Sequence, residues 1–311
     1  MKFGFCLPSE GHLARPEAIS RLAVKAEELG FYAVSLSDHV AIPEVITAPY
    51  PYTADHKVGF PPDCIEQLTS LSYLAARTSN VKLMTSIMVV PHRNPVLAAK
   101  MIANLDVFSG GRVILGAGAG WLEDEFVALG LPPFEERGKV FEEYVKVYRE
   151  LWTKDVASFD GKYVKFSKVV LEPKPVQKPG IPIWIGGESD SSMKRAAEFG
   201  DGWYPTPNNP SRPIKTKEEL GRAMSAFIKA VRGASRDPEE VTFGLGDVKP
   251  RWREPLDQGS LFAGEPSKIA ADVKDAVAAG VGYIGFNIRG RTVDETVHNM
   301  EFFAEEVLRS V

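Results

Sequence analysis

The feature that most constrains this chain is a repeated alternation of short apolar runs with amphipathic helical stretches. Runs rich in β-branched and aromatic residues are typical of buried strands, and apolar residues at helical spacing predict helices packed on them. Eight such units in 311 residues favour a (β/α)8 TIM barrel, over the alternative of a doubly wound sheet. The predicted strands span residues 3–7, 31–36, 81–90, 112–118, 183–185, 203–205, 241–248 and 283–288.

The same periodicity predicts where the helices lie and where the barrel pattern is interrupted. We expect one domain spanning residues 1–311, with a hairpin at 158–166 around Asp160-Gly161. Three irregular insertions, 40–62, 205–215 and 249–264, follow predicted strands and should therefore emerge on the C-terminal face of the barrel. The predicted helices are 16–29, 63–78, 95–108, 138–152, 217–231, 266–279 and 293–308, with a further one ending near residue 199.

Residues 181–203 predict an anion-binding turn. A short buried strand leads into Gly186-Gly187, where the backbone turns sharply, and a serine-rich segment with Asp190 then caps a helix. Free backbone N–H groups and the helix dipole at such a turn favour negative charge. The turn either binds a cofactor phosphate or is an ordinary tight strand-to-helix connection.

Composition limits the classes of function. The net charge of −4 gives no general nucleic-acid footprint, and no apolar run approaches membrane-spanning length. The first residues form too short an apolar run for a signal peptide, so we expect a cytoplasmic protein. With only Cys6 and Cys64, and five histidines that lack metal-motif spacing, the sequence predicts neither a disulfide framework nor a metal site.

In a barrel of this kind the chemistry lies on the loops that follow the strands. His39 ends the second predicted strand, where it is placed to relay a proton, with Asp38 fixing its tautomer; the alternative is a capping pair before a loop. The glycine-rich segment from Gly116 to Trp121 clears space for a flat ring close to the backbone. Other strand-end positions are Ser86 to His92, Gly186 to Ser192, Trp203 to Thr206, Asp247 and Asn287-Ile288-Arg289.

An ordered set of motifs resembles the bacterial-luciferase-like monooxygenase and oxidoreductase superfamily, over nearly the whole chain. That resemblance implies a (β/α)8 barrel that binds FMN or the deazaflavin coenzyme F420. The motifs are Ser37-Asp38-His39, Ser86-Ile87, Gly116 to Trp121 with Glu123 and Phe126, Arg137-Gly138 leading to Trp152, Phe159 to Tyr163, Pro173-Lys174-Pro175, Ile185-Gly186-Gly187 and Gly200 to Trp203.

The resemblance also implies roles for individual residues. Asp38 and His39 match residues that line the ring and the reaction centre, and Ser86-Ile87 matches a strand bulge that contains a cis non-proline peptide in many members. The segment before Trp121 matches the pyrimidine end of the ring. The implied cofactor-binding residues are Ser86, Ile87, Gly118, Ala119, Gly120, Trp121, Gly186, Gly187 and Ser191, the last three at the phosphate end.

The choice of cofactor follows from the same resemblance. Many flavin-using members place a tyrosine directly after the arginine that matches Arg137, where it reaches the phosphate, but here Gly138 follows. The stretch as a whole resembles the deazaflavin branch, which implies hydride transfer between coenzyme F420 and an organic substrate. Trp121 stands where deazaflavin sugar-phosphate dehydrogenases have glutamate, which argues against that particular activity.

Two other functions remain open. One is an FMN-dependent monooxygenase that uses oxygen and reduced flavin supplied by a partner reductase, and the other is a flavin-binding barrel without catalysis. Residues 63–78 and 95–108 carry apolar side chains on more than one face. Luciferase-like proteins often pair through this part of the barrel, so the sequence predicts a symmetric homodimer.

Overall fold

The computed structural model describes residues 1–57, 59, 61–252 and 259–311. Within these ranges eight parallel strands close into a barrel, in the order β1-β10-β9-β8-β7-β4-β3-β2, which confirms the predicted architecture. The barrel strands are β1 (Lys2–Cys6), β2 (Ala33–Leu36), β3 (Lys82–Val89), β4 (Val113–Gly118), β7 (Ile183–Gly186), β8 (Gly202–Tyr204), β9 (Thr242–Val248) and β10 (Tyr283–Phe286).

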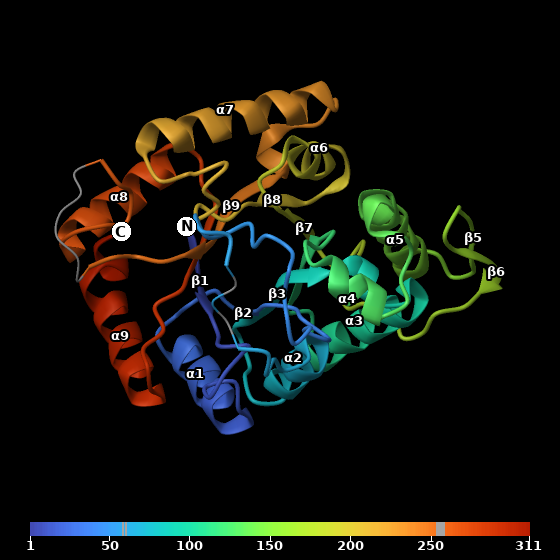
Figure 1. Cartoon of the computed structure of the whole chain (residues 1–311), viewed down its shortest axis with the longest axis horizontal. Coiled ribbons are helices and arrows are strands. Elements are labelled where there is room, and N and C mark those ends of the chain that lie inside the picture. Colours follow the sequence, from blue (N-terminus) through green and yellow to red (C-terminus); the bar gives the residue numbers. More distant parts are fainter. Residues whose placement is uncertain (58, 60, 253–258) are drawn as a thin grey trace.

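Helices surround this barrel, as the view in Figure 1 shows. They are amphipathic, because one face of each packs on the strands and the other meets solvent. On α5, for example, Val140, Tyr144 and Tyr148 are buried together on the inner face, as the spacing predicted. The helices are α1 (Pro16–Glu28), α2 (Gln67–Ala75), α3 (Pro95–Ser109), α4 (Glu123–Ala128), α5 (Arg137–Thr153), α6 (Asp190–Phe199), α7 (Lys217–Gly233), α8 (Pro266–Ala278) and α9 (Val293–Glu306).

Side chains fill the inside of the barrel, so it is a packed core and not a pore. The interior cluster combines aromatic rings with smaller apolar residues, and Trp184 packs edge-on against Tyr283 with ring centroids 5.2 Å apart. The described residues therefore leave space for a ligand where the strands end, and not inside the barrel. The cluster consists of Ala33, Met84, Ile114, Trp184, Tyr204 and Tyr283.

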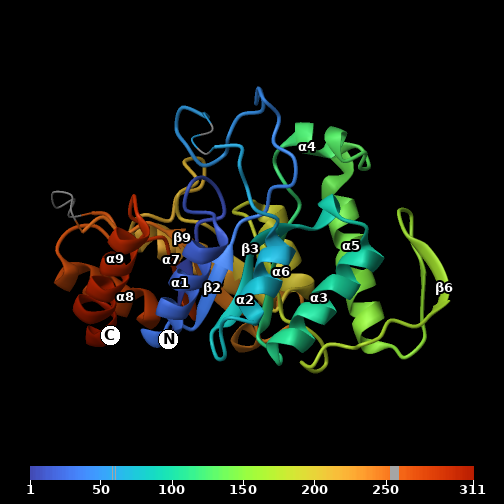
Figure 2. The same ribbon diagram turned by 90° about the horizontal axis from the view of Figure 1, so that it is seen from below.

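The connections that follow the strands gather at one end of the barrel. Figure 2 shows the segment between β2 and α2 rising above the barrel at the same end as α4. The predicted hairpin is also present: β5 (Ala157–Asp160) and β6 (Lys165–Val169) pair antiparallel beside α5. Among the described residues no helix is both long and apolar enough to cross a membrane.

Two helices differ from the sequence-based expectation. α2 begins at Gln67 and not at residue 63, because Glu66 caps it by accepting the Thr69 N–H at 2.6 Å. α4 was not predicted at all, since its six residues are too few to show a helical period. The second difference matters for function, because α4 carries the buried Glu125.

Candidate active site

A cavity of about 760 Å³ opens at the C-terminal ends of the barrel strands. This volume is within the usual range of cofactor and substrate sites. Every residue that the sequence predicted for catalysis or cofactor binding lines it. These residues are Asp38, His39, Ser86, Ile87, Gly118, Ala119, Gly120, Trp121, Gly186, Gly187 and Ser191.

Ile87 forms one wall of the cavity and requires glycine at two neighbouring positions. The Ser86–Ile87 peptide is cis, as the resemblance implied, and the register between β3 and β4 shifts at this point. A Cβ at Gly186 would lie 2.7 Å from Ile87 Cγ2, and one at Gly118 would overlap Ile87 Cδ1. The two glycines therefore let the ends of β4 and β7 approach the bulge, which leaves an apolar surface made of the Ile87 side chain and glycine backbone.

The glycine turn and the helix cap predicted at the end of β7 are present. Gly187 has φ +95°, a conformation that favours glycine, and Ser189 caps α6 by accepting the Ser192 N–H at 3.1 Å. Ser191 follows in the first turn of the helix and is exposed at the mouth of the cavity. The turn therefore presents a helix N-terminus and hydroxyl groups to the cavity, as anion sites require.

Two arginines stand at the same end of the cavity. Arg195, on the face of α6 that carries Ser191 and Ser192, donates from Nε to Glu142 at 2.8 Å. Arg137 donates from Nε to the Gly120 carbonyl at 3.2 Å, and burial together with the nearby Arg195 lowers its pKa. Arg195 is paired with Glu142, whereas Arg137 donates to the backbone carbonyls of Gly120 and Phe134. Arg137 and the N-terminus of α6 therefore give this end of the cavity its positive character.

Gly138 makes room for Arg195. The Nη2 atom of Arg195 lies 2.5 Å from the place that a Cβ of residue 138 would occupy, so a larger residue would force the guanidinium to move. Sequence reasoning selected Gly138 but missed Arg195. The spacing of Ser191 and Arg195, which puts both on one face of a helix, was the available signal.

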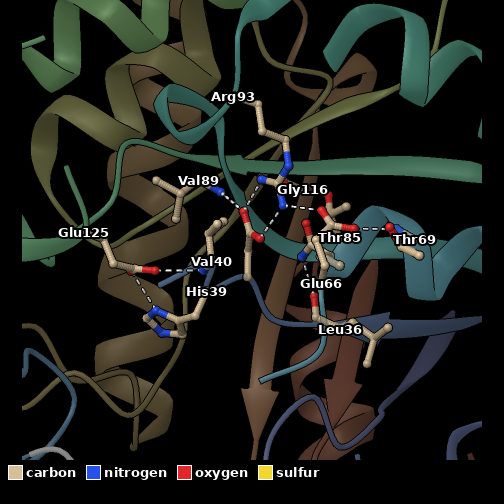
Figure 3. A network of polar contacts seen from close by, with 12 residues as sticks. Leu36, His39, Val40, Glu66, Thr69, Thr85, Val89, Arg93, Gly116 and Glu125 are labelled. Carbon is tan, nitrogen blue, oxygen red and sulfur yellow. Dashed lines mark hydrogen bonds and ion pairs between the residues drawn. The ribbon is translucent and has the colours of Figure 1, made fainter. Parts of the chain in front are cut away.

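His39 is paired with a carboxylate that the sequence did not predict. Its Nδ1 lies 2.8 Å from Glu125 Oε2, and the other oxygen of Glu125 accepts the backbone N–H of Val40 at 2.8 Å. Burial alone would raise the pKa of Glu125, but these bonds outweigh it and hold the pKa below the ordinary value. Figure 3 shows the two side chains turned toward one another. An ionised Glu125 accepts a hydrogen bond from the Nδ1–H group of His39. The other ring nitrogen, Nε2, is thereby placed for proton exchange.

The predicted pairing of Asp38 with His39 is wrong. Asp38 is buried, and its oxygens accept the backbone N–H of Val89 at 2.9 Å and two bonds from Arg93 at 2.7 and 2.8 Å. Arg93 also binds Glu66 at 2.6 Å, on the side away from His39 in Figure 3. The carboxylate of Asp38 is thus occupied by a buried guanidinium, and its role is to fix the end of β2 against β3.

Aromatic rings from the first insertion cover the cavity. Tyr50 lies edge-on to Trp121 with centroids 5.1 Å apart, and Tyr52 packs against Tyr50 at 5.4 Å. Trp121 in turn lies edge-on to His39 at 6.2 Å. Burial raises the pKa of Tyr50 to about 12, so its hydroxyl stays protonated at neutral pH. These rings form an apolar wall above His39.

Comparisons with known proteins identify the family of the chain. The luciferase-like monooxygenase model matches residues 1–250. The chain is 34% identical to an uncharacterized protein of Mycobacterium tuberculosis, covering 88% of this chain and 94% of the relative. It is 32% identical to an F420-dependent glucose-6-phosphate dehydrogenase of Amycolatopsis mediterranei, covering 94% of each.

Further relatives extend the range of cofactors. An FMNH2-dependent dimethylsulfone monooxygenase of Pseudomonas putida is 36% identical, over 52% of this chain and 44% of that protein. The crystal structure of a monooxygenase from Streptomyces bottropensis shares the fold, with a TM-score of 0.76, 24% identity and 99% coverage of both chains. From the family model and the long alignments, this chain belongs to the luciferase-like monooxygenase family.

Proposed function

We propose that the chain is a coenzyme F420-dependent oxidoreductase that transfers a hydride between the deazaflavin and a small organic substrate. The observation that carries the proposal is the cationic end of the cavity, which contains Arg137 and Arg195. Arg137 and Arg195 both line it, and Ser189 and Ser191 beside them are exposed. FMN ends in a terminal phosphate, whereas coenzyme F420 continues beyond its phosphate into an acidic tail. An open site with two guanidiniums suits coenzyme F420, whose acidic tail would extend from its phosphate toward solvent.

The rest of the cavity fits the flat ring of either cofactor. Ile87 fills the space beside Gly118 and Gly186, and its side chain together with the backbone of the two glycines lines the wall against which a ring would lie. Trp121 and Tyr50 exclude water from the opposite side. Among the relatives, the F420-dependent dehydrogenase aligns over nearly the whole chain and the FMNH2-dependent monooxygenase over about half.

His39 is the proton-transferring residue of the proposed reaction. Oxidation of an alcohol carbon releases one hydride, for which the deazaflavin supplies the acceptor, and one proton from the hydroxyl. The His39 imidazole takes that proton at Nε2, and in the reverse direction it returns the proton to the carbonyl oxygen. Glu125, bonded to Nδ1, holds the ring in the required tautomer and stabilises the imidazolium.

The second candidate is an FMN-dependent monooxygenase with a partner reductase, which the identity to the Pseudomonas putida enzyme favours. The two candidate functions can be separated by purifying the protein from a host that makes both cofactors. The absorption spectrum and the mass of the bound cofactor are then measured. We expect coenzyme F420, followed by hydride transfer to or from a substrate without oxygen. Bound FMN with oxygen-dependent turnover would establish the monooxygenase, and a bound cofactor without any turnover would indicate a binding protein.

We also propose a symmetric homodimer formed through α2 and α3. The inner faces of these helices are buried, but Leu97 is 58% exposed and Phe108 is 69% exposed on α3, with Tyr73 at 39% on α2. Several large apolar side chains exposed on adjacent helices indicate an interface. Light scattering at micromolar concentration should give the mass of a dimer, and Leu97→Lys with Phe108→Lys should reduce it to that of a monomer. A monomeric mass for the unmodified protein would rule this out.

A further inference from the structure

The side of the cavity away from the glycines carries a connected row of polar side chains, here called the polar arc. From the end of β1, Ser9 donates to Glu10 at 2.7 Å, and Arg289 after β10 donates to Glu10 at 3.2 Å. Arg289 also donates to Asn287 at 2.9 Å, and Asn287 donates to Asp247 at 2.7 Å. The polar arc consists of Ser9, Glu10, Arg289, Asn287, Asp247 and Asn208, which binds the Asp247 carbonyl at 2.8 Å.

The polar arc faces the ligand space. Glu10, Asp247 and Arg289 line the same cavity as His39 and the glycines. Arg289 and Glu10 remain 27% and 20% exposed, so their polar atoms are within reach of a bound molecule. Strands β8, β9, β10 and β1 are consecutive in the barrel, so these residues form one continuous surface.

Each positive charge on this surface is matched by a negative one. Arg289 is paired with Glu10 at 3.2 Å, and Lys249, which lines the cavity beside the polar arc, is paired with Asp247 at 3.5 Å. An anionic substrate would meet cations that are already compensated and carboxylates that repel it. A fully apolar substrate would cover these charges without replacing their hydrogen bonds to water, which is unfavourable.

We infer that the substrate is a neutral molecule with at least two hydroxyl or carbonyl groups, one at the reacting carbon beside His39 and another hydrogen-bonded by the polar arc. This inference rests on the proposed function, because it assigns the glycine side of the cavity to the cofactor. Both donors and acceptors line the cavity in the polar arc, from Arg289, Asn208 and the two carboxylates, so a hydroxyl can be bound as donor and acceptor at once.

Three cyclohexane probes of similar size test the inference. They are trans-cyclohexane-1,2-diol, cyclohexanol and cyclohexanecarboxylate, each titrated into the full-length protein by calorimetry, with saturating coenzyme F420 and, in parallel, without it. The diol should bind about 10-fold more tightly than cyclohexanol, since one additional hydrogen bond contributes at most about that factor. The carboxylate should bind most weakly of the three.

Glu10→Gln tests the charge compensation directly. The variant keeps a hydrogen-bonding side chain but leaves Arg289 without its counter-charge, so the affinity for cyclohexanecarboxylate should rise about 10-fold relative to the affinity for the diol. A gain of binding cannot result from misfolding. Glu17→Gln, an exposed glutamate in the first turn of α1, is the matched control and should change neither affinity.

The outcomes separate this inference from the proposed function. Tighter binding of the carboxylate than of the diol by the unmodified protein, equal binding of all three probes, or no effect of Glu10→Gln would each overturn the neutral-substrate inference. Failure to bind coenzyme F420 would overturn the proposed function, and the probe ranking would still be read from the titrations without cofactor.

Discussion

The two sides of the cavity are built in opposite ways. After β3, β4 and β7 the surface is made of glycines, backbone groups and Ile87, and it ends at a helix N-terminus with two arginines. After β1, β9 and β10 it is made of charged and amide side chains that bind one another. The first side offers space and a fixed anion site, whereas the second offers adaptable hydrogen bonds. In the proposed function the first side binds the cofactor and the second side binds the substrate.

His39 stands where the two sides meet, and its removal should have the largest effect. His39→Ala should lower turnover about 10²–10⁴-fold, because the substrate oxygen loses its proton partner, while the affinity for the cofactor changes little. Single-turnover hydride transfer under anaerobic conditions measures the step. Unchanged transfer in the variant would show that His39 only lines the pocket.

The next largest effect should come from the cationic end of the cavity, where Arg195 lies. Arg195→Gln removes one guanidinium from the phosphate site, and hydrogen bonds to charged groups contribute about 1.5–3 kcal/mol, so the dissociation constant of coenzyme F420 should rise roughly 10-fold or more. Arg222→Gln, an exposed arginine on α7, is the control and should leave binding unchanged. If the two variants bound the cofactor equally well, Arg195 would have no part in the site.

The glycine side can also be tested through stability. Gly118→Ala should reduce the free energy of unfolding by about 1–3 kcal/mol, because the new Cβ would overlap Ile87. Gly221 lies within α7 and has no atom near its Cβ position. Gly221→Ala should therefore raise the free energy of unfolding by about 0.5–1 kcal/mol. Urea unfolding of both variants gives the comparison, and a stable Gly118→Ala protein would show that the space at Ile87 is not restricted.

The smallest effect should be the contribution of Glu125 to the pH dependence of stability. Its pKa is lowered in the folded protein, so the ionised carboxylate stabilises the fold above the ordinary value of 4.5. That contribution is lost as the pH falls through the lowered pKa, on the order of 1 kcal/mol for each pKa unit. Melting temperatures of Glu125→Gln should therefore fall less steeply below pH 4.5 than those of the unmodified protein. If the melting temperatures of the two proteins fell in parallel as the pH is lowered, the lowered pKa of Glu125 would be contradicted.

The two sides also differ in how well the sequence predicted them. The alternation of strands and helices predicted the barrel, and the glycine turns were recognisable because backbone conformation demands a particular residue at a particular place. Gly187, with φ +95°, belongs to this class, whereas Gly118 is required because a Cβ there would overlap Ile87. The family resemblance supplied the other residues of this side, such as Ser86 and Ile87, and Arg195 was the main omission.

Contacts between distant parts of the chain were not predictable in this way. Glu125 is 86 residues from its partner His39 and lies on a helix too short to show a period, so Asp38, the sequence neighbour, was assigned in its place. The bond between Arg289 and Glu10 joins the two ends of the chain, 279 residues apart. Such pairs depend on the closed barrel and have no spacing that a single sequence displays.

The central claim is that the glycine side and its two arginines hold a deazaflavin. Fluorescence titration of the purified, cofactor-free protein with coenzyme F420 and, separately, with FMN tests it most directly. The account predicts saturable binding of coenzyme F420 with clearly higher affinity than FMN, because only F420 carries an acidic tail beyond the phosphate near Arg137 and Arg195. Tight binding of FMN together with no binding of coenzyme F420 would contradict it.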